Sequence, residues 1–179
     1  MIDINFKPGP LVLAISSALA LGYVEPAVAQ LNLSGLDGNN GIILRGGNSG
    51  DRLGGSVSSA GDINADGRPD FMLGSAFADP NGFDSGITYV VFGSDTSIES
   101  PLNLAGIDGS NGFLVHGAAA FDYSGFSVSA AGDINGDGFD DLVVGAPSSS
   151  LGGTYAGSVY IIHGSDQAFS SPLNLNQQG

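Results

Sequence analysis

Short apolar runs, each bounded by glycine or turn residues, recur along the chain after residue 30. Runs of about four to eight residues are typical of β-strands, whereas helices show longer stretches with a 3.6-residue period. The pattern predicts two groups of four strands. The expected strands are 41–45, 55–59, 70–74 and 87–91 in the first group, and 112–116, 126–130, 141–145 and 158–162 in the second.

The two groups are copies of one 71-residue repeat. Leu31-Asn32-Leu33 returns as Leu102-Asn103-Leu104 and again as Leu173-Asn174-Leu175. The connections between strands are too short for crossover helices, so we expect each copy to be a four-stranded antiparallel meander. Four such strands make one blade of a β-propeller. The predicted fold class is therefore all-β, with two blades of an incomplete propeller.

The repeat sets the expected boundaries along the chain. We assign residues 31–101 to a first blade, 102–172 to a second, and 173–179 to the truncated start of a third. Residues 1–29 differ from the rest: the apolar run 11–22 is too short to span a bilayer comfortably and precedes Ala27-Val28-Ala29, a pattern cut by signal peptidase. The segment is predicted to be a secretory signal, which implies a secreted or cell-surface protein. Because Asp3 cancels the charge of Lys7, an N-terminal extension or a remnant of a preceding blade is the alternative.

The net charge of the chain excludes some classes of binding partner. Eighteen acidic residues against four basic ones give a net charge of −14, which repels nucleic acid and anionic membrane surfaces. We therefore expect no nucleic-acid partner and no stable membrane span. Sixteen of the acids are Asp, the residue that turns and oxygen-ligated metal loops favour. The chain has no cysteine, which excludes disulfides, thiolate zinc sites and cysteine nucleophiles.

Each repeat carries an Asp-rich loop between its second and third expected strands, at residues 62–70 and 133–141. Side-chain oxygens recur at loop positions 1, 3, 5 and 9, with glycine at position 6 and a free backbone carbonyl at position 7. Calcium takes about six to eight oxygen ligands, and a loop that curls around the ion supplies them from alternate positions. The candidate calcium ligands are Asp62, Asn64, Asp66, Asp70 and the Arg68 carbonyl in one loop, and Asp133, Asn135, Asp137, Asp141 and the Phe139 carbonyl in the other.

Two other interpretations of these loops were weighed. An EF-hand requires a glutamate at position 12 and flanking helices, but Leu73 and Val144 occupy that position within strand runs. Simple Asx turns would also use Asp, Asn and Gly. Two complete copies at the same place in a repeat favour two calcium sites over turns alone. Arg68 lies inside the first loop; its side chain can point outward while its carbonyl serves the ion, and we still expect it to weaken that site.

The second repeat resembles the FG-GAP repeat of integrin α-subunit propellers and their bacterial relatives. The resemblance rests on 127–138, which reads Ser-Val-Ser-Ala-Ala-Gly-Asp-Ile-Asn-Gly-Asp-Gly, and on 141–147, which reads Asp-Leu-Val-Val-Gly-Ala-Pro. It covers residues 31–172 and implies a β-propeller, typically of seven blades, with structural calcium in the ligand loops. In integrins these loops lie on the face opposite the main ligand-binding surface.

The chain departs from the family pattern at several positions. Leu53-Gly54 and Ser124-Gly125 stand in place of Phe-Gly, and Gly74-Ser75-Ala76 replaces the first Gly-Ala-Pro. Two blades cannot close a ring that needs at least four. We therefore expect either that further blades are missing from this chain or that a homo-oligomer completes the ring and covers the open edges.

Nothing in the sequence favours catalysis. His116 and His163 are the only histidines, and the equivalent positions in the other repeat are Arg45 and Phe92. No nucleophile elbow is present in a strand-to-helix context. The leading hypothesis is a calcium-binding extracellular module for adhesion to, or recognition of, a protein or glycan. The alternatives are the accessory propeller of a larger secreted enzyme and a structural segment of a repetitive surface protein.

Overall fold

The computed structural model describes residues 32–177, so the segment 1–29 lies outside the described residues. The predicted all-β class is confirmed. The described part contains eight strands and three single-turn 3₁₀ helices, η1 (Leu33–Gly35), η2 (Leu104–Gly106) and η3 (Leu175–Gln177). No helix among these residues is long and apolar enough to cross a bilayer.

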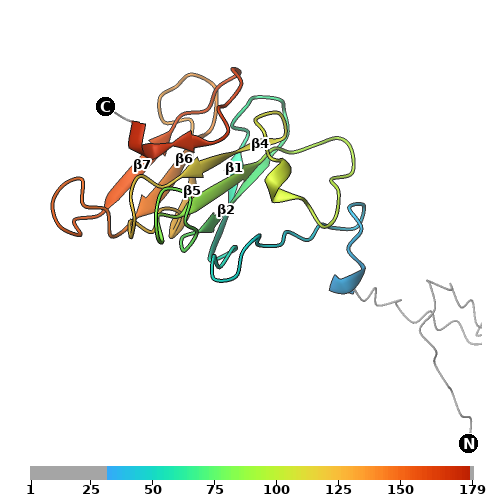
Figure 1. Ribbon diagram of the computed structural model, residues 1–179. Coiled ribbons are helices and arrows are strands. Elements are labelled where there is room, and N and C mark those ends of the chain that lie inside the picture. Colours follow the sequence, from blue (N-terminus) through green and yellow to red (C-terminus); the bar gives the residue numbers. More distant parts are fainter. Residues whose placement is uncertain (1–31, 178–179) are drawn as a thin grey trace, which may run out of the picture. The chain divides into compact units, whose positions relative to one another are not determined.

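The strands form two sheets within the unit Ser34–Gly179 (Figure 1). The first sheet has the order β1 (Ser56–Gly61), β2 (Asp70–Ser75), β3 (Ile87–Val91), β4 (Gly112–His116) and β8 (Leu173–Asn174). The second has the order β5 (Ser127–Gly132), β6 (Asp141–Ala146) and β7 (Ser158–Ile162). Neighbouring strands are antiparallel, except that β8 runs parallel to β4. These sheets are β-propeller blades.

The sheet and the sequence repeat are out of phase by one strand. β4 is the first predicted strand of the second repeat, yet it pairs with β3 of the first, from Ile87 opposite His116 to Val91 opposite Gly112. The expected meander within each repeat is thus corrected in one respect. The fourth strand of a blade comes from the following repeat, because the long connection 92–111 returns the chain to the free edge of β3.

The predicted strand 41–45 does not form a regular strand. It makes a single parallel bridge between Leu44 and Leu102, and the Leu102 amide donates to the Ile43 carbonyl at 2.9 Å. Its counterpart in the next repeat, β4, is a full strand because β3 lies beside it. Among the described residues, 41–45 has no such neighbour. The prediction of a strand here is wrong for this chain, although the backbone follows the course that the repeat requires.

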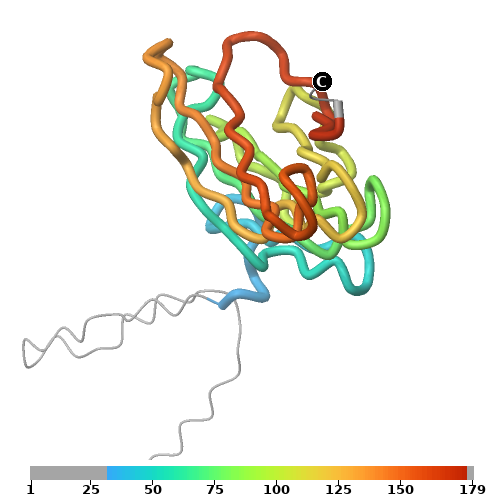
Figure 2. The backbone as a smooth tube through the Cα atoms, turned by 90° about the vertical axis from the view of Figure 1, so that its left-hand side faces the viewer, coloured from blue at the N-terminus to red at the C-terminus, as the bar shows by residue number. Residues whose placement is uncertain are grey.

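The two sheets pack with β1 against β5 (Figure 2). The hydrophobic core lies between them. Alternate residues of the first sheet face this core and are fully buried. The rings of Phe113 and Phe169 stack at 4.3 Å between centroids. The buried members are Ala60, Ile63, Met72, Val90, Phe113 and Val115 from the first sheet and its loop, with Leu142, Val144, Ile162 and Leu175 opposite them.

Replacing Phe113 by alanine tests this core. The side chain is fully buried, so Phe113→Ala should lower the free energy of unfolding by about 3–5 kcal/mol. The exposed Phe83 provides a matched control, since Phe83→Ala should change stability by less than about 0.5 kcal/mol. Urea denaturation of the two variants measures the difference. Equal stabilities would contradict the described packing.

Candidate metal centre

The two Asp-rich loops occupy equivalent places in the structure. They join β1 to β2 and β5 to β6, at the equivalent end of the strands in each sheet. The glycines at position 6, Gly67 and Gly138, have φ angles of +85° and +95°. This backbone region strongly favours glycine, which accounts for glycine at position 6 of both loops.

Side-chain oxygens from positions 1 and 3 converge inside each loop. In the second loop, Oδ1 of Asp133 and Oδ1 of Asn135 both accept a hydrogen bond from the Asp137 amide at 3.0 Å. In the first, Asp62 and Asn64 accept from the Asp66 amide at 3.0 and 3.1 Å. Two oxygens bound to one N–H must lie close to each other. The backbone therefore holds the two ligand oxygens of each loop beside a common point.

The carboxylates at position 9 are buried and fixed by backbone amides. Asp70 accepts from the Ile63 amide at 3.0 Å and the Gly93 amide at 2.7 Å. Asp141 accepts from Ile134 and Gly164, both at 2.9 Å. Each carboxylate thus ties its loop to the segment that follows β3 or β7.

The pKa values of these two equivalent carboxyls shift in opposite directions. Burial raises the pKa of Asp70 above its ordinary value, against the two amide hydrogen bonds. Burial also opposes ionisation of Asp141, but hydrogen bonds from Gly164, Ile134 and His163 together lower its pKa. Nδ1 of His163 lies 3.2 Å from Oδ1 of Asp141, whereas Phe92 occupies the position equivalent to His163 in the first repeat. The histidine is one chemical difference between the two sites.

Arg68 interacts with one of the candidate ligands. Its guanidinium lies 3.3 Å from Oδ2 of Asp66 and also pairs with Asp95. The hydrogen bond and charge of Asp95 raise the pKa of Arg68, which keeps the guanidinium charged. The second loop has no arginine, and Phe139 stands at the equivalent position. A cation would therefore meet a partly neutralised carboxylate at position 5 in the first loop only.

Not all predicted ligands are brought together. Among residues 32–177, no three acidic or histidine side chains gather as a metal-binding group. Oδ1 of Asp66 and of Asp137 accept from the amides of Arg68 and Phe139, at 2.9 and 3.0 Å, so both loops adopt linked Asx turns. The donors are carboxylate, amide and carbonyl oxygens, the chemistry that calcium selects. The residues therefore fit a calcium ion chemically.

An interaction between the two loops was not foreseen from the sequence. Oδ2 of Asp140 accepts from the Asp62 amide at 2.8 Å, and the Asp140 amide donates to the Asp62 carbonyl at 3.3 Å. The Ser165 amide donates to the Ile63 carbonyl at 2.9 Å. The first loop is thus fastened to the second sheet. The repeat comparison hides this contact, because position 8 is Pro69 in the first loop and Asp140 in the second.

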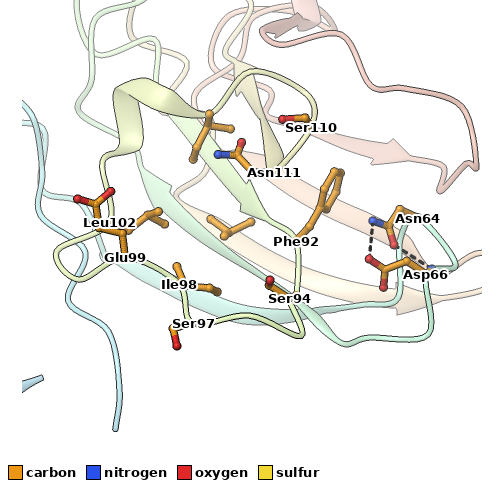
Figure 3. Close-up of a pocket in the computed structure, with 13 residues that line it drawn as sticks. Asn64, Asp66, Phe92, Ser94, Ser97, Ile98, Glu99, Leu102, Ser110 and Asn111 are labelled. Carbon is orange, nitrogen blue, oxygen red and sulfur yellow. Dashed lines mark hydrogen bonds between the residues drawn. The ribbon is translucent and has the colours of Figure 1, made fainter. Parts of the chain in front are cut away.

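A hollow of about 340 Å³ adjoins the first loop (Figure 3). Asn64 and Asp66 lie at one end of it and Glu99 at the other. Phe92 and Ile98 add apolar surface. Serine, asparagine and aspartate side chains of its wall already bond to neighbouring side chains or to backbone, as Asn64 does to Asp66. The hollow accordingly presents few unused hydrogen-bonding groups.

The comparisons with known proteins agree with the fold. The FG-GAP repeat family matches residues 124–162, which include all of β5, β6 and β7. Phosphatidylinositol-glycan-specific phospholipase D of Mus musculus is 40% identical over 130 residues, covering 69% of this chain and 14% of that protein. Integrin alpha pat-2 of Caenorhabditis elegans is 34% identical over 129 residues, covering 65% and 10%. Integrin alpha-PS5 of Drosophila melanogaster is 32% identical over 131 residues, covering 73% and 12%. The chain therefore matches only a small part of each relative.

Position 4 of the loops offers a test of backbone strain. Ala65 has φ +52° in the first loop, while Gly136 has φ +76° at the same position in the second. A side chain costs about 1–2 kcal/mol in this region. Gly136→Ala should lower the free energy of unfolding by that amount, and Ala65→Gly should not lower it. Chemical denaturation in chelator measures both, and an unchanged stability of Gly136→Ala would contradict the described turn.

The effect of His163 on Asp141 predicts a pH response. A lowered folded-state pKa gives stability that is fully present above the unfolded value, about 3.9, and is lost as pH falls through the folded value. His163→Phe removes one of the interactions that lower the pKa of Asp141, so that pKa should rise and the acid end of the stability profile should move to higher pH. Carboxyl ¹³C NMR titration of chelator-treated protein measures the change. The Asp70 titration should stay the same, and an unaltered Asp141 titration would refute the role of His163.

Proposed function

We propose that this chain, an FG-GAP repeat protein similar to integrin α chains, is a calcium-stabilised β-propeller module that recognises a protein or glycan outside the cell. The observation that carries the proposal is the pair of oxygen-rich loops at equivalent places in two sheets. In each loop, the oxygens at positions 1 and 3 converge on one backbone amide. A single loop could be only a turn, whereas two in register favour a selected ligand set.

Calcium would stabilise the fold through contacts already present between the loops. The Asp62 backbone is bonded to Asp140, so order in the first loop extends to the second sheet. An ion that binds only the folded state adds about 2.7 kcal/mol when its concentration is 100 times the dissociation constant. The role proposed for calcium is therefore structural. The second loop is expected to bind more tightly, because Arg68 competes for Asp66 in the first.

We propose that the protein or glycan binds at the opposite end of the strands, where the loops after β2, β4 and β6 lie. Phe83 and Phe121 are 60% and 49% exposed, with ring centroids 5.4 Å apart. The Phe121 amide donates to the Phe83 carbonyl at 2.7 Å, which fixes the two loops together. Leu151 and Tyr155 are exposed on the loop after β6. Ordered, exposed aromatic and aliphatic side chains are suited to partner contact. No catalytic role is proposed for the chain itself.

A second candidate is an accessory propeller of a larger secreted enzyme. The observation in its favour is the 40% identity to a relative named as a phospholipase D. The gene neighbourhood distinguishes the two: a hydrolase sequence continuous with this reading frame would favour the accessory role. The relatives include surface and extracellular proteins, and an extracellular location for this chain is part of the same proposal.

Calcium titration tests the proposal. Calorimetry of the chelator-treated full chain should detect two sites, and calcium should raise the melting temperature. Asp133→Ala and Asp137→Ala should each remove the tighter site and most of the thermal stabilisation. Asp166→Ala, at an exposed position outside both loops, is the matched control and should behave like the wild type. If calcium produces neither heat nor a shift in melting temperature, the loops are only turns and the proposal fails.

A further inference from the structure

We propose that the open face of β5, β6 and β7 binds the first sheet of a second copy of this chain, head to tail. This inference rests on sheet packing and not on calcium binding. It starts from a contrast between equivalent residues of the two repeats. The two sheets of the chain pack against each other through one face each. Their other two faces are equivalent, through the repeat, to the two faces that are already in contact.

The open face is the counterpart of a face that is buried within the chain. Val90 and Thr88 are fully buried under the second sheet, whereas their equivalents Ile161 and Val159 are 52% and 68% exposed. The loop residue Ile63 is 0% exposed, and its equivalent Ile134 is 51% exposed. Side chains at the same positions are thus covered in one repeat and uncovered in the other, and the uncovered ones are apolar. Exposed apolar side chains that share one face mark interaction sites.

The outer face of the first sheet is the matching half. Val128 packs on the completed core, but its equivalent Val57 is 64% exposed. Tyr89 and Leu114, in register with Val57 across the sheet, belong to a second, smaller apolar cluster whose buried members are Val91, Leu104 and Ile107. In the completed core, the equivalents of Val91 and Leu104 are Ile162 and Leu175, and a facing sheet covers them. Partly buried side chains of this face, such as Tyr89 and Leu114, have no facing sheet among the described residues, and Ile134, Val159 and Ile161 of another copy would supply one.

The strand edges complement each other in the same way. β7 is an edge strand of the second sheet as described, and 41–45 forms only one bridge. β3 pairs with β4 from Ile87 opposite His116 to Val91 opposite Gly112. Transferred to the next contact, this register sets Ser158 opposite Arg45 and Ile162 opposite Gly41. Residues 41–45 of one copy would thereby become the fourth strand beside β7 of the other.

A hollow on the open face corresponds to a point of close backbone approach in the completed contact. The Gly125 carbonyl accepts from Oγ of Ser56 at 2.7 Å and lies 1.9 Å from where a Cβ of Gly74 would be. The equivalent glycine, Gly145, lines an open hollow of about 430 Å³ together with Ser127 and Val159. In the second copy, Gly54 is the residue equivalent to Gly125 and would enter this hollow.

One polar contact would be missing from the contact between copies. Asp140 binds the Asp62 amide within the chain, but Pro69 takes the place of Asp140 in the first repeat. Each copy also carries a net charge of −14, so the copies repel each other at low salt. We therefore expect association to be weaker than the internal packing and to strengthen with ionic strength. A heterologous contact of this type repeats from copy to copy until a ring closes or a filament grows.

Complementing variants test the proposal. Val57→Asp damages one half of the contact and Ile161→Asp the other, and both residues are exposed, so the variants should fold. Sedimentation velocity of the full chain should show concentration-dependent association of the wild type. Each variant alone should lose this association. An equimolar mixture should form a dimer and nothing larger, because Val57→Asp keeps an intact β5–β7 face and Ile161→Asp keeps an intact first sheet.

The controls separate this result from general aggregation. Phe83→Asp changes an apolar residue that is 60% exposed on a loop of the contact already completed within the chain, and it should associate like the wild type. Thermal melting confirms that all variants fold. A wild type that stays monomeric over the accessible concentration and salt range overturns the proposal. This is the result expected if a partner other than a second copy covers the face. Failure of the mixed variants to form a dimer also overturns it.

Discussion

Burial of one face of the first sheet under the second is the interaction on which the rest of the structure depends. The central side chains of that face, Met72, Val90 and Phe113, are completely shielded only because Leu142 and Val144 lie opposite them. A sheet with an apolar face must bury that face against another element. The loops are equally dependent, since the first is held in place by hydrogen bonds from Asp140 and Ser165 of the neighbouring unit.

Sequence reasoning succeeded where the cause of structure is local. Seven of the eight predicted strands are present within one or two residues, because apolar runs between turn residues determine them. The glycines at position 6 take the backbone angles expected of them. Segment 41–45 failed because its strand character depends on a distant partner and not on its own composition. The assignment of β4 to the preceding sheet could not be predicted either, since a periodic pattern has no marked starting point.

The candidate site shows the same division. The order of Asp, Asn and Gly predicted loops with converging oxygens, and the hydrogen bonds of Asp62, Asn64, Asp133 and Asn135 have that arrangement. The sequence could not predict how the carboxylates at position 9 are held, because Gly93 and Gly164 reach them from another strand connection. Nor could it show that His163 acts on Asp141, although the substitution of Phe92 by His163 between repeats was a visible signal. Two loops with the same candidate ligand residues therefore have different electrostatic surroundings.

The one-strand offset between repeat and sheet separates the unit of duplication from the unit of folding. A newly copied 71-residue segment brings the strand that completes the sheet before it and leaves its own sheet one strand short. Each new copy is thus hydrogen-bonded to the preceding repeat from the start, and the repeats of such an array cannot become independent domains. Because one strand of each repeat belongs to the preceding sheet, the loss of part of a repeat damages two sheets at once. Gene rearrangements in such arrays should consequently survive only when they add or remove whole repeats.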